Sequence, residues 1–285
     1  MIIDDHRHIG NCEGRGIITY EMILDDMKKK RIDVSVVCPG GAADEDREMA
    51  RDEAVEKEMA LLAEAGSYFA DRKITPLIER MRKRRIGHSK VKEAIIRSQG
   101  RIKGGWFLSP WAGQEEFAEA EDALKNSGFV YLKLHPQHHC FCPDDRDISH
   151  VYEFAASIDV PVWFHSSYGP GSEIRRIAEA AKMNPHVILV MGHACVEPGP
   201  SLMDDLEEAF RHDNIYLELA HVKIDDFVEV LRRFPHGRLI AGTDNPCDAY
   251  DTVFDHFIKR KEKMPCTEGS WEKILGGNAA EIYRI

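Results

Sequence analysis

Two histidines separated by one residue, His6 and His8, lie near the start of the chain, at the end of an apolar run that begins at Ile2. The run predicts a β-strand, in which alternate side chains share one face. Two imidazoles on one face can bind one metal ion, although a chain with 14 histidines can also carry such a pair by chance. Regular alternation gives two sets of side chains: Asp4, His6 and His8 on one face, and Ile3, Asp5 and Arg7 on the other.

Later apolar runs also end in ionisable residues, and these add to the metal-site interpretation. Imidazole and carboxylate groups are the ligands that a catalytic zinc-like ion requires, with one coordination position left open for water. Three histidines and one aspartate from the first, fifth and eighth predicted strands would supply such a set. They are His6, His8, His165 and Asp244.

The elements that must position these residues alternate between strand and helix. Amphipathic stretches separate the apolar runs, as expected for βα units around a parallel sheet. Eight such units favour a closed (β/α)8 TIM barrel, of the α/β class, whose active site lies at the carboxyl ends of the strands. The predicted strands are Ile2–His6, Val34–Cys38, Gly104–Leu108, Val130–His135, Val160–His165, Val187–Met191, Ile215–Leu219 and Arg238–Gly242. The clearest helices are Tyr20–Lys30, Glu115–Asn126, Glu173–Asn184, Leu202–His212 and Asp225–Phe234.

The interval between the second and third predicted strands is too long for one helix. Residues 44–98 are charged and have apolar residues at helical spacing, which predicts a helical insertion of two or three helices. Since the insertion leaves the carboxyl end of a strand, it could cover the mouth of the active site. An oligomer contact and an elaborated outer helix are equally open alternatives.

The fourth predicted strand carries a lysine whose direction follows from alternation. Leu132 and Leu134 share one face and should contact the outer helices, so Lys133 and His135 should face the barrel mouth. Lys133 could act as a cation for a substrate carboxylate or carbonyl, or it could be carbamylated and bridge two metals. The alternative is a structural ion pair with Asp4 or Glu218.

Composition limits the classes of function. The 285 residues, 43% of them hydrophobic, suit a single domain spanning residues 1–285. A net charge of −11 argues against a nucleic-acid surface, and the basic run at residues 80–85 is interpreted as a helix face or a partner contact. No run of apolar residues approaches the roughly 20 that a membrane helix needs. We expect a cytoplasmic protein with a small-molecule substrate and neither nucleic acid nor membrane as a partner; a homo-oligomer is left open.

Taken in order, these motifs resemble the amidohydrolase superfamily. The resemblance is greatest to its amidohydrolase-related branch (family 2) of metal-dependent hydrolases and decarboxylases, which includes enzymes of the aminocarboxymuconate semialdehyde decarboxylase type. It spans nearly the whole chain, and each motif is specific only in this order and spacing. The motifs are DxHxH from Asp4, LKLHP from Leu132, PVWFH ending at His165, GH at Gly192, GTDNP from Gly242 and the tail at 274–280.

The resemblance implies one divalent ion, usually zinc, bound by His6, His8, His165 and Asp244. It implies that His193 is an acid or base beside the ion. In binuclear relatives the equivalent histidine binds a second ion together with a carboxylated lysine, so a second ion at His193 and Lys133 is left open.

Such a site activates water for attack on a carbonyl carbon. The expected catalytic residues are Asp244, which accepts the proton of the water, His193, which donates to the leaving group, and Lys133, which stabilises the oxyanion. Substrate binding is assigned to Lys133, His135 and Arg15. The favoured function is a metal-dependent hydrolase of an amide, ester or lactone of a small polar molecule. The alternative is a non-oxidative decarboxylase of an unsaturated or aromatic acid.

Overall fold

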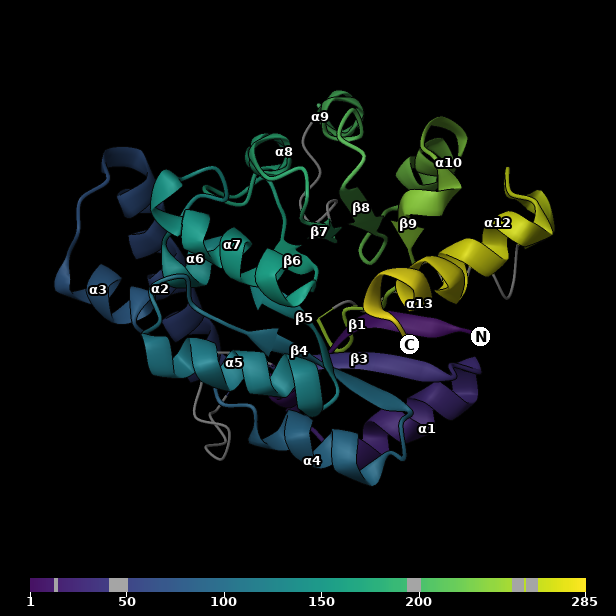
Figure 1. Ribbon diagram of the computed structural model, residues 1–285, viewed down its shortest axis with the longest axis horizontal. Helices are drawn as coiled ribbons and strands as arrows, with labels where there is room; N and C mark the ends of the chain where they lie inside the picture. Colours follow the sequence, from purple (N-terminus) through teal and green to yellow (C-terminus); the bar gives the residue numbers. More distant parts are fainter. Residues whose placement is uncertain (13–14, 41–50, 194–200, 248–253, 255–260) are drawn as a thin grey trace.

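A computed structural model describes residues 1–12, 15–40, 51–193, 201–247, 254 and 261–285 (Figure 1). In these residues one sheet has the strand order β2-β1-β3-β4-β5-β6-β7-β8-β9, and every neighbouring pair is parallel except β1 and β2. The strands are β1 Ile3–Cys12, β2 Gly16–Ile18, β3 Val34–Pro39, β4 Ile102–Phe107, β5 Phe129–Leu134, β6 Val162–His165, β7 Leu189–Gly192, β8 Ile215–Glu218 and β9 Leu239–Ile240. The hairpin that lengthens β1 and pairs it with β2 was not expected from the sequence.

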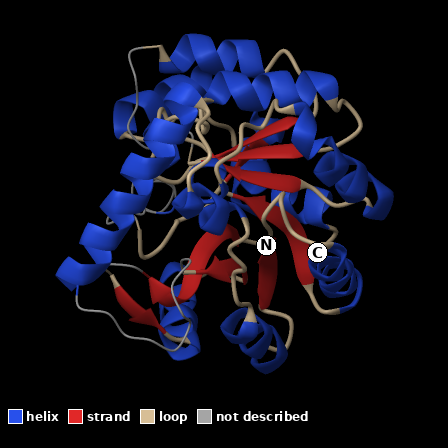
Figure 2. Ribbon diagram, turned by 90° about the vertical axis from the view of Figure 1, so that its left-hand side faces the viewer, coloured by secondary structure: helices blue, strands red, loops and turns tan. Residues whose placement is uncertain are grey.

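The sheet closes on itself at a seam between β1 and the segment that follows β9. The Asp5 N–H donates to the carbonyl of Ala241 (3.0 Å), the His8 N–H donates to the carbonyl of Asn245 (2.8 Å), and the Asp244 N–H donates to the carbonyl of His6 (2.8 Å). The eight parallel strands of the described chain thus form the predicted (β/α)8 TIM barrel, with helices around the strands (Figure 2).

Helices pack on the outer surface of the barrel, and outward side chains such as Leu132 and Leu134 join the core between the two layers. The outer helices are α1 Tyr20–Lys30, α4 Ser89–Arg97, α5 Gln114–Asn126, α7 Ser149–Ile158, α8 Ile174–Met183, α9 Leu202–Ala209 and α10 Ile224–Arg233. Shorter helices are α6 Pro136–His139, η1 Arg146–Ile148, η2 His236–Arg238, η3 Lys261–Lys263, α12 Glu268–Glu272, η4 Lys273–Gly277 and α13 Asn278–Tyr283. None of the helices in the described part of the chain is long and apolar enough to cross a membrane.

The last helix, α13, fills one end of the barrel. Ala279, Ile282 and Tyr283 pack against interior side chains that include Ile3 and Tyr131. These contacts lie toward the strand starts, so the opposite end, where the ionisable residues gather, is the open one.

The first strand departs from regular alternation, and one prediction is wrong for that reason. The pairing of β1 with β3 changes register between Asp4 and Arg7, which marks a β-bulge. The Trp163 indole, inside the barrel, donates to the Asp5 carboxylate and lies over the His6 ring, so both of these neighbours face inward. The Asp4 carboxylate instead accepts hydrogen bonds from Thr243 and Ser35, and Asp4 does not share the face of His6 and His8.

The long interval after β3 contains three helices: α2 Arg51–Asp71, α3 Pro76–Arg82 and α4. The α4 helix packs on β3 and β4 through Val91 and Ala94, so it is the ordinary outer helix of its βα unit. By contrast, α2 and α3 contact α6, which follows β5 at the open end of the barrel (Figure 1). Residues 44–50 of the predicted insertion lie outside the described residues.

The buried histidine at the N-cap of α4, His88, makes its contacts in the neutral form. The Nε2 atom of His88 accepts the Phe107 N–H at 2.9 Å, and its ring stacks on Trp106 with centroids 3.9 Å apart. Burial, reinforced by Lys92 and Arg85, lowers the pKa of His88 from 6.5 to about 3. Below pH 6.5 the unfolded chain therefore binds a proton that the folded chain does not.

We therefore expect His88 to destabilise the fold as the pH decreases from about 6.5 toward 3. Its contribution should be a loss of about 1.4 kcal/mol in the free energy of unfolding per pH unit. Denaturant unfolding at several pH values should show a shallower pH dependence in His88→Gln, which retains an acceptor but does not titrate, whereas exposed His186→Gln should behave as the parent. Equal slopes in His88→Gln and the parent would contradict this assignment.

Candidate functional site

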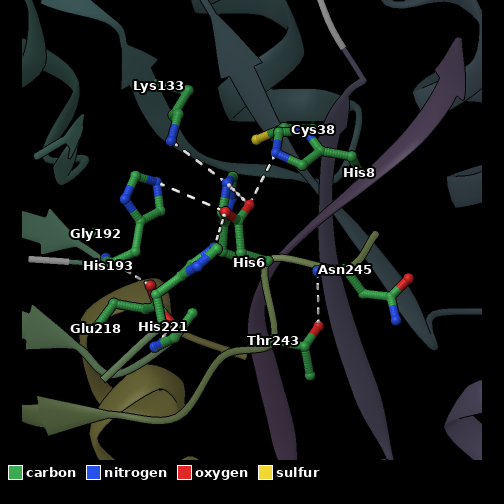
Figure 3. A network of polar contacts seen from close by, with 12 residues as sticks. His6, His8, Cys38, Lys133, Gly192, His193, Glu218, His221, Thr243 and Asn245 are labelled. Carbon is green, nitrogen blue, oxygen red and sulfur yellow. Dashed lines mark hydrogen bonds and ion pairs between the residues drawn. The ribbon is translucent and has the colours of Figure 1, made fainter. Parts of the chain in front are cut away.

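The side chains of His6 and His8 lie close together (Figure 3), and the side chain of Asp244 meets them. Their ligand atoms all lie within 4.8 Å of one another. The Oδ1 atom of Asp244 is 3.3 Å from His6 Nε2 and 3.0 Å from His8 Nε2. Two atoms bound to a tetrahedral ion at 2.0–2.1 Å lie about 3.3 Å apart, so this spacing suits a divalent metal.

Hydrogen bonds behind the two histidines turn the same ring nitrogen of each toward Asp244. His8 Nδ1 lies 3.0 Å from the carbonyl oxygen of Pro39, which can only accept, so Nδ1 must donate. The Nε2 atom of His8 is therefore the ring nitrogen that faces Asp244 Oδ1, on the side where an ion shared with the carboxylate would bind. His6 Nδ1 contacts the Tyr131 hydroxyl at 3.2 Å. Hydrogen bonds to the ring nitrogen that faces away from the ion are typical of metal-bound imidazoles, so the residues fit a divalent ion.

The loop that carries Asp244 is held by the first strand. The Asp4 carboxylate accepts hydrogen bonds from the Thr243 N–H (2.9 Å) and the Thr243 hydroxyl (3.0 Å). The Thr243 hydroxyl oxygen also accepts the Asn245 N–H (3.2 Å). These bonds fix the residues on both sides of Asp244, whose own φ is +48°.

The second oxygen of Asp244 faces two further histidines. Its Oδ2 atom is 2.7 Å from His221 Nε2 and 4.0 Å from His193 Nε2. Burial raises the pKa of Asp244, but the charge of His193 and the hydrogen bonds of His221, His6 and His8 outweigh burial and hold it well below its usual range. Asp244 is therefore ionised and connects two pairs of imidazoles.

His221 was missed in the sequence. It follows the predicted strand Ile215–Leu219 by two residues, so its place after a barrel strand was the available signal. His193, by contrast, was expected. Its Nδ1 atom lies 3.3 Å from the carbonyl of Ser166, which leaves Nε2 directed toward Asp244.

Lys133 faces the barrel interior, as alternation predicted. Its Nζ atom is 3.4 Å from His6 Nε2 and 3.2 Å from the centroid of the Trp163 ring. Burial lowers the pKa of Lys133 to about 8, although neighbouring thiol and carboxyl groups oppose the shift. Among the described residues no carboxylate lies within ion-pair distance of Nζ, so the alternative of an ion pair with Asp4 or Glu218 is wrong.

His165 lies at the same end of the barrel. It is not part of the group formed by His6, His8 and Asp244, which we call the metal trio. Its ring stacks on His135 with centroids 3.9 Å apart and meets the edge of His193 at 4.5 Å. His138, to which the sequence assigned no task, stacks on the other side of His135 at 3.9 Å. Within the described chain, no group of ligand atoms that includes His165 is as compact as the trio, so its role as the fourth ligand stays a prediction.

Arg15, the remaining predicted substrate residue, is exposed in the turn between β1 and β2. Its N–H donates to the carbonyl of Cys12 (2.8 Å), and its guanidinium acts electrostatically on the Cys12 thiol. A role in substrate binding stays a prediction.

Comparison with known proteins was made on both sequence and structure. The family model described as Amidohydrolase matches residues 75–285. A search of curated proteins finds no match.

Solved structures share the fold at low sequence identity. A dihydroxybenzoic acid decarboxylase from Polaromonas sp. JS666, with bound manganese and the inhibitor 2-nitroresorcinol, is 14% identical (TM-score 0.62; 99% of this chain, 96% of that chain). A 2,6-dihydroxybenzoate decarboxylase from Rhizobium is 13% identical (0.64; 99% and 98%). A probable 2-pyrone-4,6-dicarboxylic acid hydrolase from Acinetobacter baumannii with bound citric acid is 12% identical (0.65; 100% and 99%). At these identities the likeness concerns the barrel alone.

The trio leads to a prediction about metal affinity. Removing an outer-shell partner of a metal ligand typically costs 10- to 100-fold in affinity, so His8→Ala, which removes a ligand, should cost more than about 10²-fold. Titration of metal-free protein with Zn²⁺ and Mn²⁺ measures this loss, with His186→Ala as the exposed control. Parent-like affinity in His8→Ala would show that the trio does not bind the ion.

A second prediction concerns the number of ions. Because only one compact trio includes Asp244 in the described chain, we expect one ion per chain, retained in His193→Asn. Elemental analysis of purified protein gives the stoichiometry. Two ions in the parent and one in His193→Asn would establish the binuclear alternative instead.

Proposed function

Because this chain belongs to the amidohydrolase family, we propose that it is a metal-dependent hydrolase that cleaves an amide, ester or lactone bond of a small polar molecule. The observation that carries the proposal is the double role of the Asp244 carboxylate. Its Oδ1 atom faces His6 and His8, and its Oδ2 atom faces His221 and His193. One carboxylate thus joins the metal-ligand set to two groups that can transfer protons.

We assign the ion to His6, His8 and Asp244, with His165 as the proposed fourth ligand and zinc as the proposed metal. When bound, a divalent ion supplies Lewis acidity that lowers the pKa of water and polarises a carbonyl group. Asp244 is the ionised base of the site, so its Oδ2 atom takes a proton from the attacking water. His221 donates a hydrogen bond from Nε2 to that oxygen at 2.7 Å and so stabilises the carboxylate before transfer.

His193 is the proposed acid for the leaving group. Its Nδ1 donates to the Ser166 carbonyl, and burial holds the pKa of His193 well below its usual range, so Nε2 starts without a proton. Nε2 takes the proton that Asp244 Oδ2 has accepted from water and delivers it to the leaving group. A positioned general acid or base typically contributes 10²- to 10⁴-fold to the rate.

Lys133 and His135 are proposed to bind substrate, with Arg15 at the rim. Lys133 is a buried cation without a carboxylate partner in the described chain, and such a group gains most from an anionic oxygen of the substrate. A carboxylate or a developing oxyanion satisfies this requirement. The residues therefore favour a substrate that carries negative charge at or beside the reacting group.

A second candidate function is non-oxidative decarboxylation of an unsaturated or aromatic acid. The Lys133 cation, which has no carboxylate partner among the described residues, would orient the carboxylate that is lost, and His193 or Asp244 would deliver the proton to the carbon that lost it. Decarboxylases of the same fold are among the structures similar to this chain. Hydrolysis is preferred because it needs a proton acceptor for water and a proton donor for the leaving group. Asp244 Oδ2 and the imidazoles beside it provide both.

The test is turnover of the metal-loaded protein on lactones, esters, amides and aromatic acids, with proton release and carbon dioxide measured together. We expect proton release without carbon dioxide on a lactone or ester that carries a carboxylate. Asp244→Asn should lower kcat by roughly 10²- to 10⁴-fold, because an amide cannot take the proton of water. Carbon dioxide release would support the decarboxylase instead, and parent-like turnover in Asp244→Asn would remove the proposed base.

A further inference from the structure

The turns after β7, β8 and β9 share an unusual backbone conformation. His193, His221 and Asp244 have φ values of +38°, +61° and +48°. Non-glycine residues seldom adopt positive φ, and such conformations persist only where the surroundings enforce them. His193 and His221 both face the Oδ2 atom of Asp244. The contacts that enforce these three turns therefore also position the groups that transfer protons.

Glu218, the last residue of β8, contacts two of these turns directly. It is fully buried, and its two carboxylate oxygens have different partners. Oε2 accepts the His193 N–H at 2.9 Å (Figure 3). Oε1 accepts the N–H of Ala220, next to His221, at 2.7 Å. One carboxylate therefore holds the backbone of both histidine-bearing turns.

The third turn leaves room for the same side chain. A Cβ atom at Gly242 would lie 2.1 Å from Glu218 Oε1 and 2.8 Å from its Cδ atom, far inside van der Waals contact. Gly242 is two residues before Asp244, and its φ is not positive, so the glycine is required by space rather than by backbone conformation. Glu218 thus contacts the ends of three consecutive strands.

We propose that Glu218 is a positioning residue, which holds His193 and His221 on either side of Asp244 Oδ2 without contacting the substrate. This inference rests on the proposed function for the roles of the two histidines. The metal trio has separate supports, in Pro39, Tyr131 and the Asp4–Thr243 bonds. Loss of Glu218 should therefore disturb proton transfer and leave metal binding intact.

The chemistry of the acceptor makes the proposal testable with a side chain of the same size. A glutamine at 218 offers one carbonyl oxygen, and its NH₂ group would face a backbone N–H, donor against donor. Glu218→Gln therefore keeps at most one of the two hydrogen bonds. Gly242→Ala should have a similar effect from the other side, because its methyl group displaces the Glu218 carboxylate.

The experiment compares Glu218→Gln, Gly242→Ala and exposed Glu179→Gln, all loaded with Zn²⁺. We expect parent-like metal content in all three. In Glu218→Gln and Gly242→Ala the ring ¹⁵N resonances of His193 and His221 should shift, and kcat on the best substrate should decrease by about 10²-fold with KM nearly unchanged. Glu179→Gln should match the parent in every measurement.

A double variant separates positioning from general damage to the barrel. In a Glu218→Ala background the side chain that collides with residue 242 is gone, so adding Gly242→Ala should lower kcat little further. Unchanged histidine resonances in Glu218→Gln would overturn the proposal, as would loss of metal together with activity. Because the resonances are measured without substrate, failure to find a hydrolytic substrate would count against the proposed function alone.

Discussion

The carboxylate of Asp244 is the interaction on which the site depends. It lies at the meeting point of four imidazoles, two on each oxygen, and it is buried away from water that would otherwise compete for these contacts. An ionised carboxylate in such a place is stable only if the groups around it supply positive charge or hydrogen bonds. The protein meets this requirement with two histidines of β1, with histidines in the turns after β7 and β8 and, in our proposal, with a metal ion. The same residue therefore matters both for the stability of the folded site and for its chemistry.

Closure of the barrel is part of the same arrangement. The seam between β1 and the segment after β9 is made by backbone hydrogen bonds that involve His6, His8 and Asp244 themselves. The β-bulge turns Asp4 away from the metal trio and toward Thr243, where its carboxylate supports the loop that carries Asp244. The first motif of the sequence therefore contributes two proposed ligands and one support, rather than three side chains on one face.

Much of the fold was predictable because it follows from patterns of burial. The helix Tyr20–Lys30 has the bounds that its amphipathic pattern predicted, and Lys133 faces inward because its neighbours Leu132 and Leu134 pack outward. The metal trio was predictable since strand ends of a parallel barrel converge. The alternation of side chains along a strand cannot reveal a place where the backbone itself departs from regular geometry. The bulge at Asp4 depends on hydrogen bonds with residues distant in sequence, and the left-handed turn at His221 depends on the buried carboxylate of Glu218, which accepts the Ala220 N–H, so neither was found.

The seam also determines when the site can exist during synthesis. His8 and Asp244 are 236 residues apart in sequence but 3.0 Å apart in the folded protein. At about 5–20 residues per second, a ribosome needs on the order of 10 to 50 s to make the intervening chain. Throughout that time the two histidines of β1 have neither their carboxylate nor a closed barrel around them. An ion that requires all three side chains can be retained only once the last strand has docked, so metal uptake marks the completion of the barrel.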